Sequence, residues 1–133
     1  MKYFLDTNIC IYYLKGLFPK LKEKLLSYNP DTIVIPVITK AELLLGAEKS
    51  TQKEETLKKI NQFLLPFQII DFTDKETTIY ASIRAKLEKT GTIIGPNDLL
   101  IASIVLSNNG ILVTRNVKEF SRIKNLKIEN WTE

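Results

Sequence analysis

Four oxygen-bearing side chains occupy comparable places in the sequence. Asp6 and Asn116 each follow a short apolar segment typical of a β-strand, and Glu42 and Asp98 stand near the starts of helical segments. Carboxylate and amide oxygens suit Mg²⁺, which keeps several waters and usually needs only one or two protein carboxylates beside a substrate phosphate. The set therefore indicates a divalent-metal site, and such a site can promote hydrolysis.

Asp98 is the acid that local folding rules explain least well. It stands directly before eight uncharged residues, Leu99–Leu106. Burying an unpaired charge costs several kcal/mol, whereas the positive end of a helix dipole stabilises a nearby anion by only about 0.3–1 kcal/mol. Asn97 is the better candidate for the helix N-cap, which leaves Asp98 without an evident local partner. A bound cation would balance its charge.

Asp6 and Glu42 also have structural explanations. Asp6 can cap the helix that follows it, by accepting a backbone N–H. Thr39 and Glu42 fit the S/T-x-x-E capping box, and the local pattern alone favours capping over catalysis for Glu42. If Asp6, Glu42 and Asp98 share one cleft, however, their charges repel unless a divalent cation lies among them.

The composition excludes several kinds of chemistry. The 133 residues contain no histidine and one cysteine, Cys10. Ser–His–Asp and Cys–His catalysis, histidine metal ligands and thiolate zinc sites are therefore excluded. The net charge of +4 is compatible with a nucleic-acid partner but is weak evidence. The single cysteine, the absence of a signal-like start and the lack of a long apolar run lead us to expect a cytoplasmic protein with no membrane contact.

Alternating strand and helix segments predict the fold. We expect strands at 3–5, 32–36, 67–72 and 111–114, with a further edge strand at 126–130. Helices between them imply crossover connections, and so a three-layer α/β/α sandwich with a mostly parallel sheet of four to five strands. We expect residues 1–133 to form one domain. Binding sites in such sheets lie at the carboxyl ends of the strands. Helices are expected at 7–15, 20–28, 39–50, 53–65, 74–91, 96–110 and 117–123.

Four blocks of the chain resemble PIN-domain proteins, and VapC-type toxins of bacterial toxin–antitoxin pairs in particular. They are FLDTNICIYYL, TKAELLLGA, IGPNDLLIASI and ILVTRNVKEFSRI, in that order and spacing. The resemblance covers the chain from Tyr3 to Trp131. It implies the PIN fold and a Mg²⁺- or Mn²⁺-dependent endoribonuclease. It also implies inhibition by a cognate antitoxin, a homodimer, and higher toxin–antitoxin assemblies.

Matching these blocks implies roles for individual residues. The family's acidic site falls on Asp6, Glu42 and Asp98, as metal ligands and catalytic groups. Its fourth position, frequently Asp, is Asn116 here, which lowers the charge from four acids to three. Asp6 and Asp98 would bind the ion, and Glu42 would bind it too or orient the attacking water. The residues that would support this site are Thr7, Asn8 and Thr114.

The resemblance also suggests where RNA and the antitoxin bind. Arg115 is the best candidate for an RNA contact, and Lys40 and Arg84 are weaker ones, since ordinary solvated surface explains most basic residues. The segments ICIYYL and ELLLG carry more apolar surface than one helix face needs, which favours an interface. Candidates for an antitoxin groove are Tyr12, Tyr13 and Leu44.

Two other functions remain open on the sequence. A Mg²⁺-dependent phosphatase or receiver-like domain would also place an Asp after its first strand. Phosphatases of the haloacid-dehalogenase type need a second Asp two residues later, where this chain has Asn8. A non-catalytic binding module, in which the acids serve only as helix caps, is the alternative from a different class.

Overall fold

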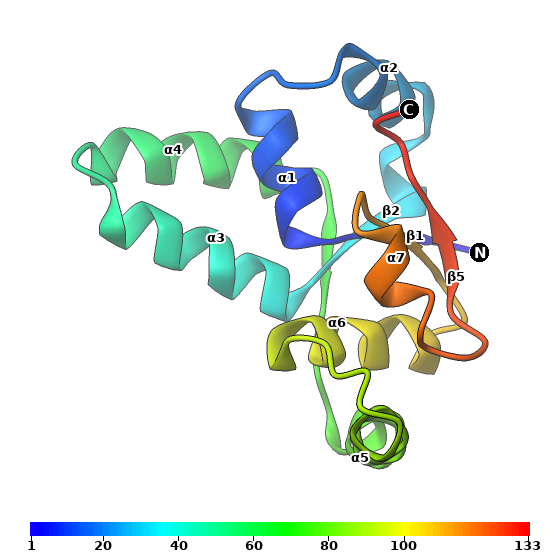
Figure 1. Cartoon of the computed structure of the whole chain (residues 1–133). Coiled ribbons are helices and arrows are strands. Elements are labelled where there is room, and N and C mark those ends of the chain that lie inside the picture. Colours follow the sequence, from blue (N-terminus) through cyan, green and yellow to red (C-terminus); the bar gives the residue numbers. More distant parts are fainter.

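A five-stranded sheet runs through the middle of the computed structural model, which describes residues 1–133 (Figure 1). All four pairs of neighbouring strands are parallel, in the order β3-β2-β1-β4-β5. The predicted parallel α/β architecture is therefore confirmed, including the fifth strand at the edge. The strands are β1 Tyr3–Leu5, β2 Ile33–Pro36, β3 Gln68–Ile70, β4 Ile111–Val113 and β5 Lys127–Glu129.

Seven α-helices and one 3₁₀ turn connect and cover the strands. Their bounds agree with the predicted helices to within a few residues, because each has an apolar face at helical spacing or a clear turn at its end. None of them combines the length and apolar character needed to cross a lipid bilayer. They are α1 Thr7–Leu14, α2 Pro19–Ser27, η1 Pro30–Thr32, α3 Val37–Lys49, α4 Lys53–Leu64, α5 Asp74–Lys89, α6 Pro96–Ser107 and α7 Val117–Phe120.

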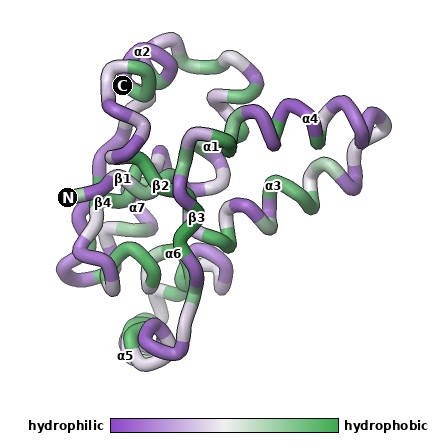
Figure 2. Tube along the Cα trace, turned by 180° about the vertical axis from the view of Figure 1, so that it is seen from behind, coloured by the Kyte–Doolittle hydropathy of each residue, from purple (hydrophilic) through white to green (hydrophobic).

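The sheet separates two hydrophobic cores because successive strand residues point to opposite faces. Leu5 and Val113 lie in the core formed with α1–α4, whereas Phe4, Val34 and Leu112 lie in the core formed with α5–α7. Half of the residues of α6 are buried, and its trace and that of the central strands are mainly coloured as hydrophobic in Figure 2. The uniformly apolar strands of the sequence therefore reflect helices on both faces.

The order of the strands reverses direction at β1, which pairs with β2 on one side and β4 on the other. Leu5 is in register with Val113, so β1 and β4 end side by side. The backbone N–H of Asp6 continues this register by donating to Val113 O at 3.2 Å. In open α/β sheets, the crevice beyond such a switch point is where ligands bind.

Two local capping assignments are wrong. The N-cap of α3 is Pro36, not Thr39, and the buried Thr39 hydroxyl donates to Leu5 O at 3.1 Å. Glu42 therefore takes no part in a capping box. Asn97 lies inside α6, whose N-cap is Gly95. In both cases the helix begins before the predicted cap, so the polar side chain is free to contact another element.

A buried carboxylate holds α5 against α6. Glu76 is 3% exposed, and one of its oxygens accepts from the backbone N–H and hydroxyl of Thr73 in a capping box. Its other oxygen accepts from the Ser107 hydroxyl at 2.5 Å. Burial acts to raise the pKa of Glu76, but the donors from Ser107 and Thr73 outweigh it and lower the pKa.

The mutation Ser107→Ala should destabilise the fold by about 1–3 kcal/mol, because it removes a donor from a buried carboxylate. Urea denaturation of the purified protein measures this loss. Ser121→Ala is the matched control, since the exposed Ser121 hydroxyl bonds only to Val117 O of its own helix. Equal stability losses for the two variants would contradict the role given to Ser107.

Candidate active site

Asp6 is the most buried acid near the carboxyl ends of the strands, with an exposed fraction of 5%. Its Oδ1 accepts from the backbone N–H of Ile9 at 2.9 Å, so it does cap α1 as one interpretation of the sequence expected. Burial raises its pKa to about 6. Hydrogen bonds from Thr114 and Ile9 oppose this rise, whereas nearby Asp98 and Glu42 add to it. Asp6 is thus both a helix cap and a member of an acidic group.

Glu42 joins three helices through its two oxygens. Thr7, the first residue of α1, donates to Oε1 at 2.5 Å, and the Asn97 amide of α6 donates to Oε2 at 3.3 Å. Residues 35 and 55 positions away in the sequence therefore hold one side chain. This arrangement explains why Glu42 and Asn97 are not local helix caps.

Asp98 is half-buried in the first turn of α6. Burial is the main reason that its pKa is raised, and the charges of Glu42 and Glu119 add to the effect. No lysine or arginine pairs with it, because the ion pairs of the structure are Lys53–Glu48 and Arg84–Glu88. Asp98 therefore takes part in no ion pair of the structure.

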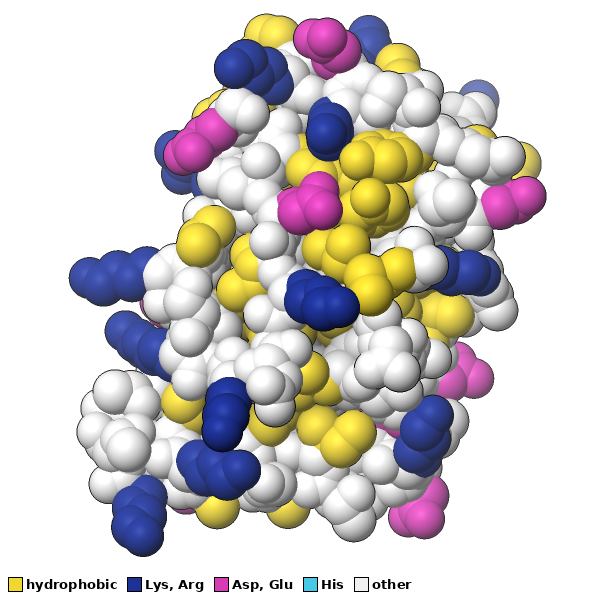
Figure 3. All heavy atoms as spheres, turned by 90° about the vertical axis from the view of Figure 1, so that its right-hand side faces the viewer, with side chains coloured by type: hydrophobic (Ala, Val, Ile, Leu, Met, Phe, Trp, Pro, Cys, Tyr) yellow, Lys and Arg dark blue, Asp and Glu magenta, His cyan; other side chains and the backbone are white.

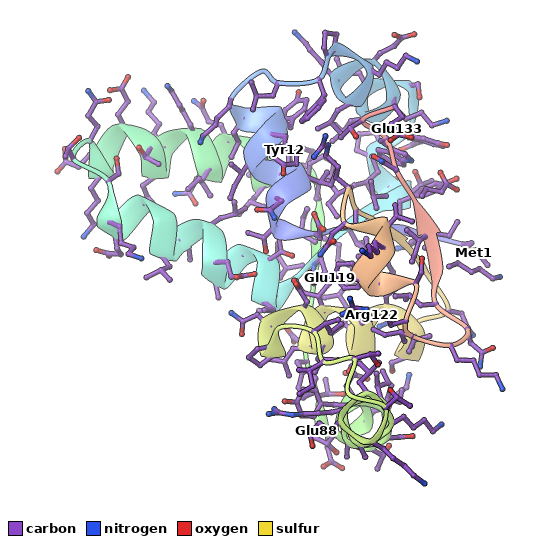
Figure 4. All side chains as sticks on the ribbon, in the orientation of Figure 1. Met1, Tyr12, Glu88, Glu119, Arg122 and Glu133 are labelled. Atoms are coloured by element: carbon purple, nitrogen blue, oxygen red, sulfur yellow. The ribbon has the colours of Figure 1, made fainter.

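Glu119 is a member of this group that the sequence analysis missed. The Asn116 amide donates to Glu119 Oε2 at 3.0 Å, and the Asn116 backbone N–H donates to Thr114 Oγ1 at 2.9 Å. Figure 4 shows Glu119 near the middle of the molecule, beside α7 and above α6. Glu119 follows Asn116 by three residues, one turn of α7, and an acid at this helical spacing is the sequence signal that could have revealed it.

A pocket of about 230 Å³ opens beside these groups. It is smaller than the roughly 300–1,000 Å³ typical of small-molecule sites, so it suits one part of a larger ligand. A pocket of about 510 Å³ between α1, α2 and α4 contains no acid, so its size does not make it the reactive site. The smaller pocket, called the acidic pocket below, is lined by Asp6, Asn8, Tyr12, Arg115 and Asn116.

Arg115 is the basic residue that the structure brings to this pocket. Arg84 lies on α5, where it pairs with Glu88 at 3.0 Å and donates to the Tyr80 hydroxyl at 2.6 Å; Figure 4 shows Glu88 at the far edge of the molecule from Tyr12. Lys40 is half-buried on α3 and does not line the pocket. On the side that Figure 3 shows, Lys and Arg are scattered among Asp and Glu, as on an ordinary solvated surface.

The acids fit a hydrated cation better than a compact ligand shell. No group of three or more His, Cys, Asp or Glu side chains is arranged so that it could hold a metal ion. Both Glu42 oxygens are instead hydrogen-bonded to neutral donors. A buried Asp6 with raised pKa near half-buried Asp98 still forms the donor set that suits Mg²⁺, which retains waters and needs few carboxylates.

Asp6→Asn should stabilise the metal-free protein at pH 7.5 but not at pH 4. The folded state raises the pKa of Asp6 from 3.8 to about 6, so its contribution to stability is present below pH 4 and is lost as the pH rises through 6. The full loss is on the order of 3 kcal/mol. Urea denaturation in EDTA at the two pH values measures it. Asp31→Asn, at an exposed position, is the control, and a pH-independent effect of Asp6→Asn would refute the assignment.

The chain is similar to known proteins over almost its whole length. The PIN domain family model matches residues 3–126. "Ribonuclease VapC2" of Rickettsia felis is 47% identical over 135 residues, covering 98% of both chains. "tRNA(fMet)-specific endonuclease VapC" of Salmonella typhimurium is 35% identical over 131 residues, again covering 98% of both.

Solved structures give the same result for the fold. The crystal structure of VapBC2 from Rickettsia felis bound to a promoter DNA fragment matches with a TM-score of 0.90 at 46% identity, covering 98% of this chain and 99% of that one. DNA-bound VapBC from Salmonella typhimurium matches with a TM-score of 0.92 at 35% identity, covering 98% of both. The chain therefore belongs to the PIN-domain family and, within it, to the group of VapC proteins.

Proposed function

We propose that this protein is a metal-dependent endoribonuclease toxin that hydrolyses phosphodiester bonds of RNA. The observation that carries the proposal is the electrostatically coupled group of Asp6, Glu42 and Asp98 at the switch point of the sheet. The similarity to proteins named as ribonucleases supports the reaction and the substrate class.

Asp6 and Asp98 would hold Mg²⁺ or Mn²⁺, directly or through water. When bound, such an ion polarises the scissile phosphate and lowers the pKa of a bound water. Glu42, fixed by Thr7 and Asn97, would orient the attacking water. The remaining hydrogen-bonding groups, Asn8, Thr114, Asn116 and Glu119, would order the surrounding waters.

Glu119 compensates for the amide at position 116. Family resemblance alone implied a site reduced to three acids. In the structure, however, the Asn116 amide donates to Glu119, and the negative charge of Glu119 raises the pKa of Asp98. The fourth negative charge is thus supplied one helical turn later. We propose that Asn116 positions this carboxylate.

An antitoxin of the VapB type is the proposed inhibitor, since the similar solved structures are VapBC complexes. The apolar 510 Å³ pocket between α1, α2 and α4 suits an apolar face of such a partner, and Tyr13 lines it. Leu44 is half-buried against the hydrophobic core formed with α1–α4. Tyr12, by contrast, lines the acidic pocket. We also propose a homodimer, and a cytoplasmic location where its RNA substrates would be.

The competing functions gain little support. The structure leaves Asn8, where a dehalogenase-type phosphatase needs its second Asp, exposed at the mouth of the acidic pocket. The capping contact of Asp6 agrees with a non-catalytic module. However, capping gives no reason to place Asp98 and Glu42 where they raise the pKa of the cap.

Asp98→Asn should reduce RNA cleavage by roughly 100-fold or more, because losing a residue that only supports a metal ligand already costs 10- to 100-fold. The melting temperature should stay the same or rise, since burial raises the pKa of Asp98 in the folded protein. Cleavage of total RNA in Mg²⁺ and a thermal scan measure the two effects. Retained cleavage with lost stability would overturn the catalytic role.

Calorimetric titration of the unmutated protein with Mn²⁺ tests the non-catalytic alternative. The absence of Mn²⁺ binding would favour the non-catalytic module.

Glu119→Gln should lower cleavage by about 10- to 100-fold while preserving the fold, because the amide keeps an acceptor for Asn116 but removes the charge near Asp98. Initial rates over a Mg²⁺ titration measure the effect, which should include a weaker apparent metal affinity. Glu88→Gln on α5 is the control. Equal rates for both variants would remove Glu119 from the site.

A further inference from the structure

One wall of the acidic pocket has no part in the hydrolysis described above. It consists of Tyr12 from α1 and Arg115 from the segment after β4. Behind them lies Phe18, in the turn between α1 and α2. The Arg115 guanidinium carbon is 5.0 Å from the centroid of the Phe18 ring, and the ring centroids of Tyr12 and Phe18 are 5.2 Å apart in an edge-to-face arrangement. The three side chains therefore form one continuous cluster, of which Tyr12 and Arg115 line the pocket.

Phe18 is held in place by its backbone and by packing. Its φ angle of 58° lies in the left-handed region, which is unfavourable for a bulky residue, and Gly16, two residues earlier, has a φ of 70°. The half-buried ring packs against the core on the α1 face. A strained conformation persists only where its surroundings over-determine it. The turn therefore presents the face of Phe18 to Arg115 in a fixed position.

Arg115 has no acidic partner in the protein. Both ion pairs of the structure involve other residues, and the Arg115 side chain is exposed. The cation–aromatic pair of Arg84 and Tyr80 provides a contrast, because Arg84 is neutralised by Glu88 on the same helix. The charge of Arg115 is thus available to a ligand in the pocket, next to Asp6.

A planar guanidinium that rests on an aromatic ring has two recognition surfaces. Its N–H groups can hold a phosphate, and its open face can stack on a nucleobase. Stacking on a side chain requires an unpaired base, since bases inside a duplex are already stacked on one another. The acids beside Arg115 would then act on the phosphodiester bond next to the stacked nucleotide.

We propose that Arg115, positioned by Phe18 and Tyr12, is a nucleotide subsite that stacks an unpaired base of RNA beside the scissile phosphate. This inference rests on the proposed ribonuclease function. Arg115 contacts the substrate, whereas Phe18 and Tyr12 are positioning residues that act through it. The subsite selects a single-stranded or looped-out nucleotide over a paired one.

The test uses the full chain with Asp98→Asn, which binds without cutting. Fluorescence anisotropy compares a labelled uridine dodecamer with a dodecamer of the same ribose–phosphate backbone that lacks bases. Arg115→Lys keeps the positive charge but removes the planar guanidinium that stacks on a base. Phe18→Leu keeps the apolar volume but removes the aromatic ring. Each should weaken binding of the uridine oligomer roughly tenfold, and leave the abasic oligomer within about twofold.

Matched controls are Arg84→Lys and Tyr80→Leu, which alter the other cation–aromatic pair and should change neither affinity. Equal losses for both oligomers, or no loss for Arg115→Lys, would overturn the subsite. If Phe18→Leu fails to fold, Arg115→Lys decides alone.

Cleavage by the protein with Asp98 intact separates this inference from the proposed function. Arg115→Lys should raise KM for the uridine oligomer with kcat changed less than about twofold. Base-dependent binding without any RNA cleavage would support the subsite and reject the ribonuclease function. RNA cleavage by a protein that binds the uridine and abasic oligomers equally well would support the ribonuclease function and reject the subsite.

Discussion

Repulsion among carboxylates at the carboxyl ends of the strands is the constraint on which this structure depends. Asp6 is almost fully buried, and Asp98 and Glu42 are near enough to raise its pKa further. Every one of these charges would be more stable in water. The fold tolerates them because the two cores on either side of the sheet supply the stability that the site gives up. A cation-binding enzyme needs this arrangement, and a purely structural protein does not.

The backbone brings the acids together with little help from ion pairs. The register between β1 and β4 places Asp6 beside Thr114, and the buried Thr39 hydroxyl ties the start of α3 to the end of β1. Neutral donors from Thr7 and Asn97 then hold Glu42. Neutral donors leave the negative charge of the site intact, whereas a lysine in the same position would cancel it.

The wall of the acidic pocket that carries Arg115 is held by packing on an aromatic ring and not by hydrogen bonds to neutral donors. Arg115 is positive and exposed, yet it rests on Phe18 rather than on a nearby acid. Because Arg115 lies beside Asp6 in one pocket without forming an ion pair, one part of the pocket can attract a cation and the adjacent part an anion. A phosphodiester with its metal ion needs both.

The sequence by itself determined the strands and helices, the placement of Asp6 and Asn116 after strands, and that of Asp98 at a helix start, because apolar periodicity and turn residues act over a few positions. Tertiary structure decided which side chains meet. Glu42 resembles a local cap in the sequence, but it accepts from Thr7 and Asn97; the charge of Glu119 acts on Asp98, and Phe18 packs on Arg115. These contacts depend on the order of the strands and on where each helix begins. Residues 35 to 97 positions apart meet only once β1 lies between β2 and β4.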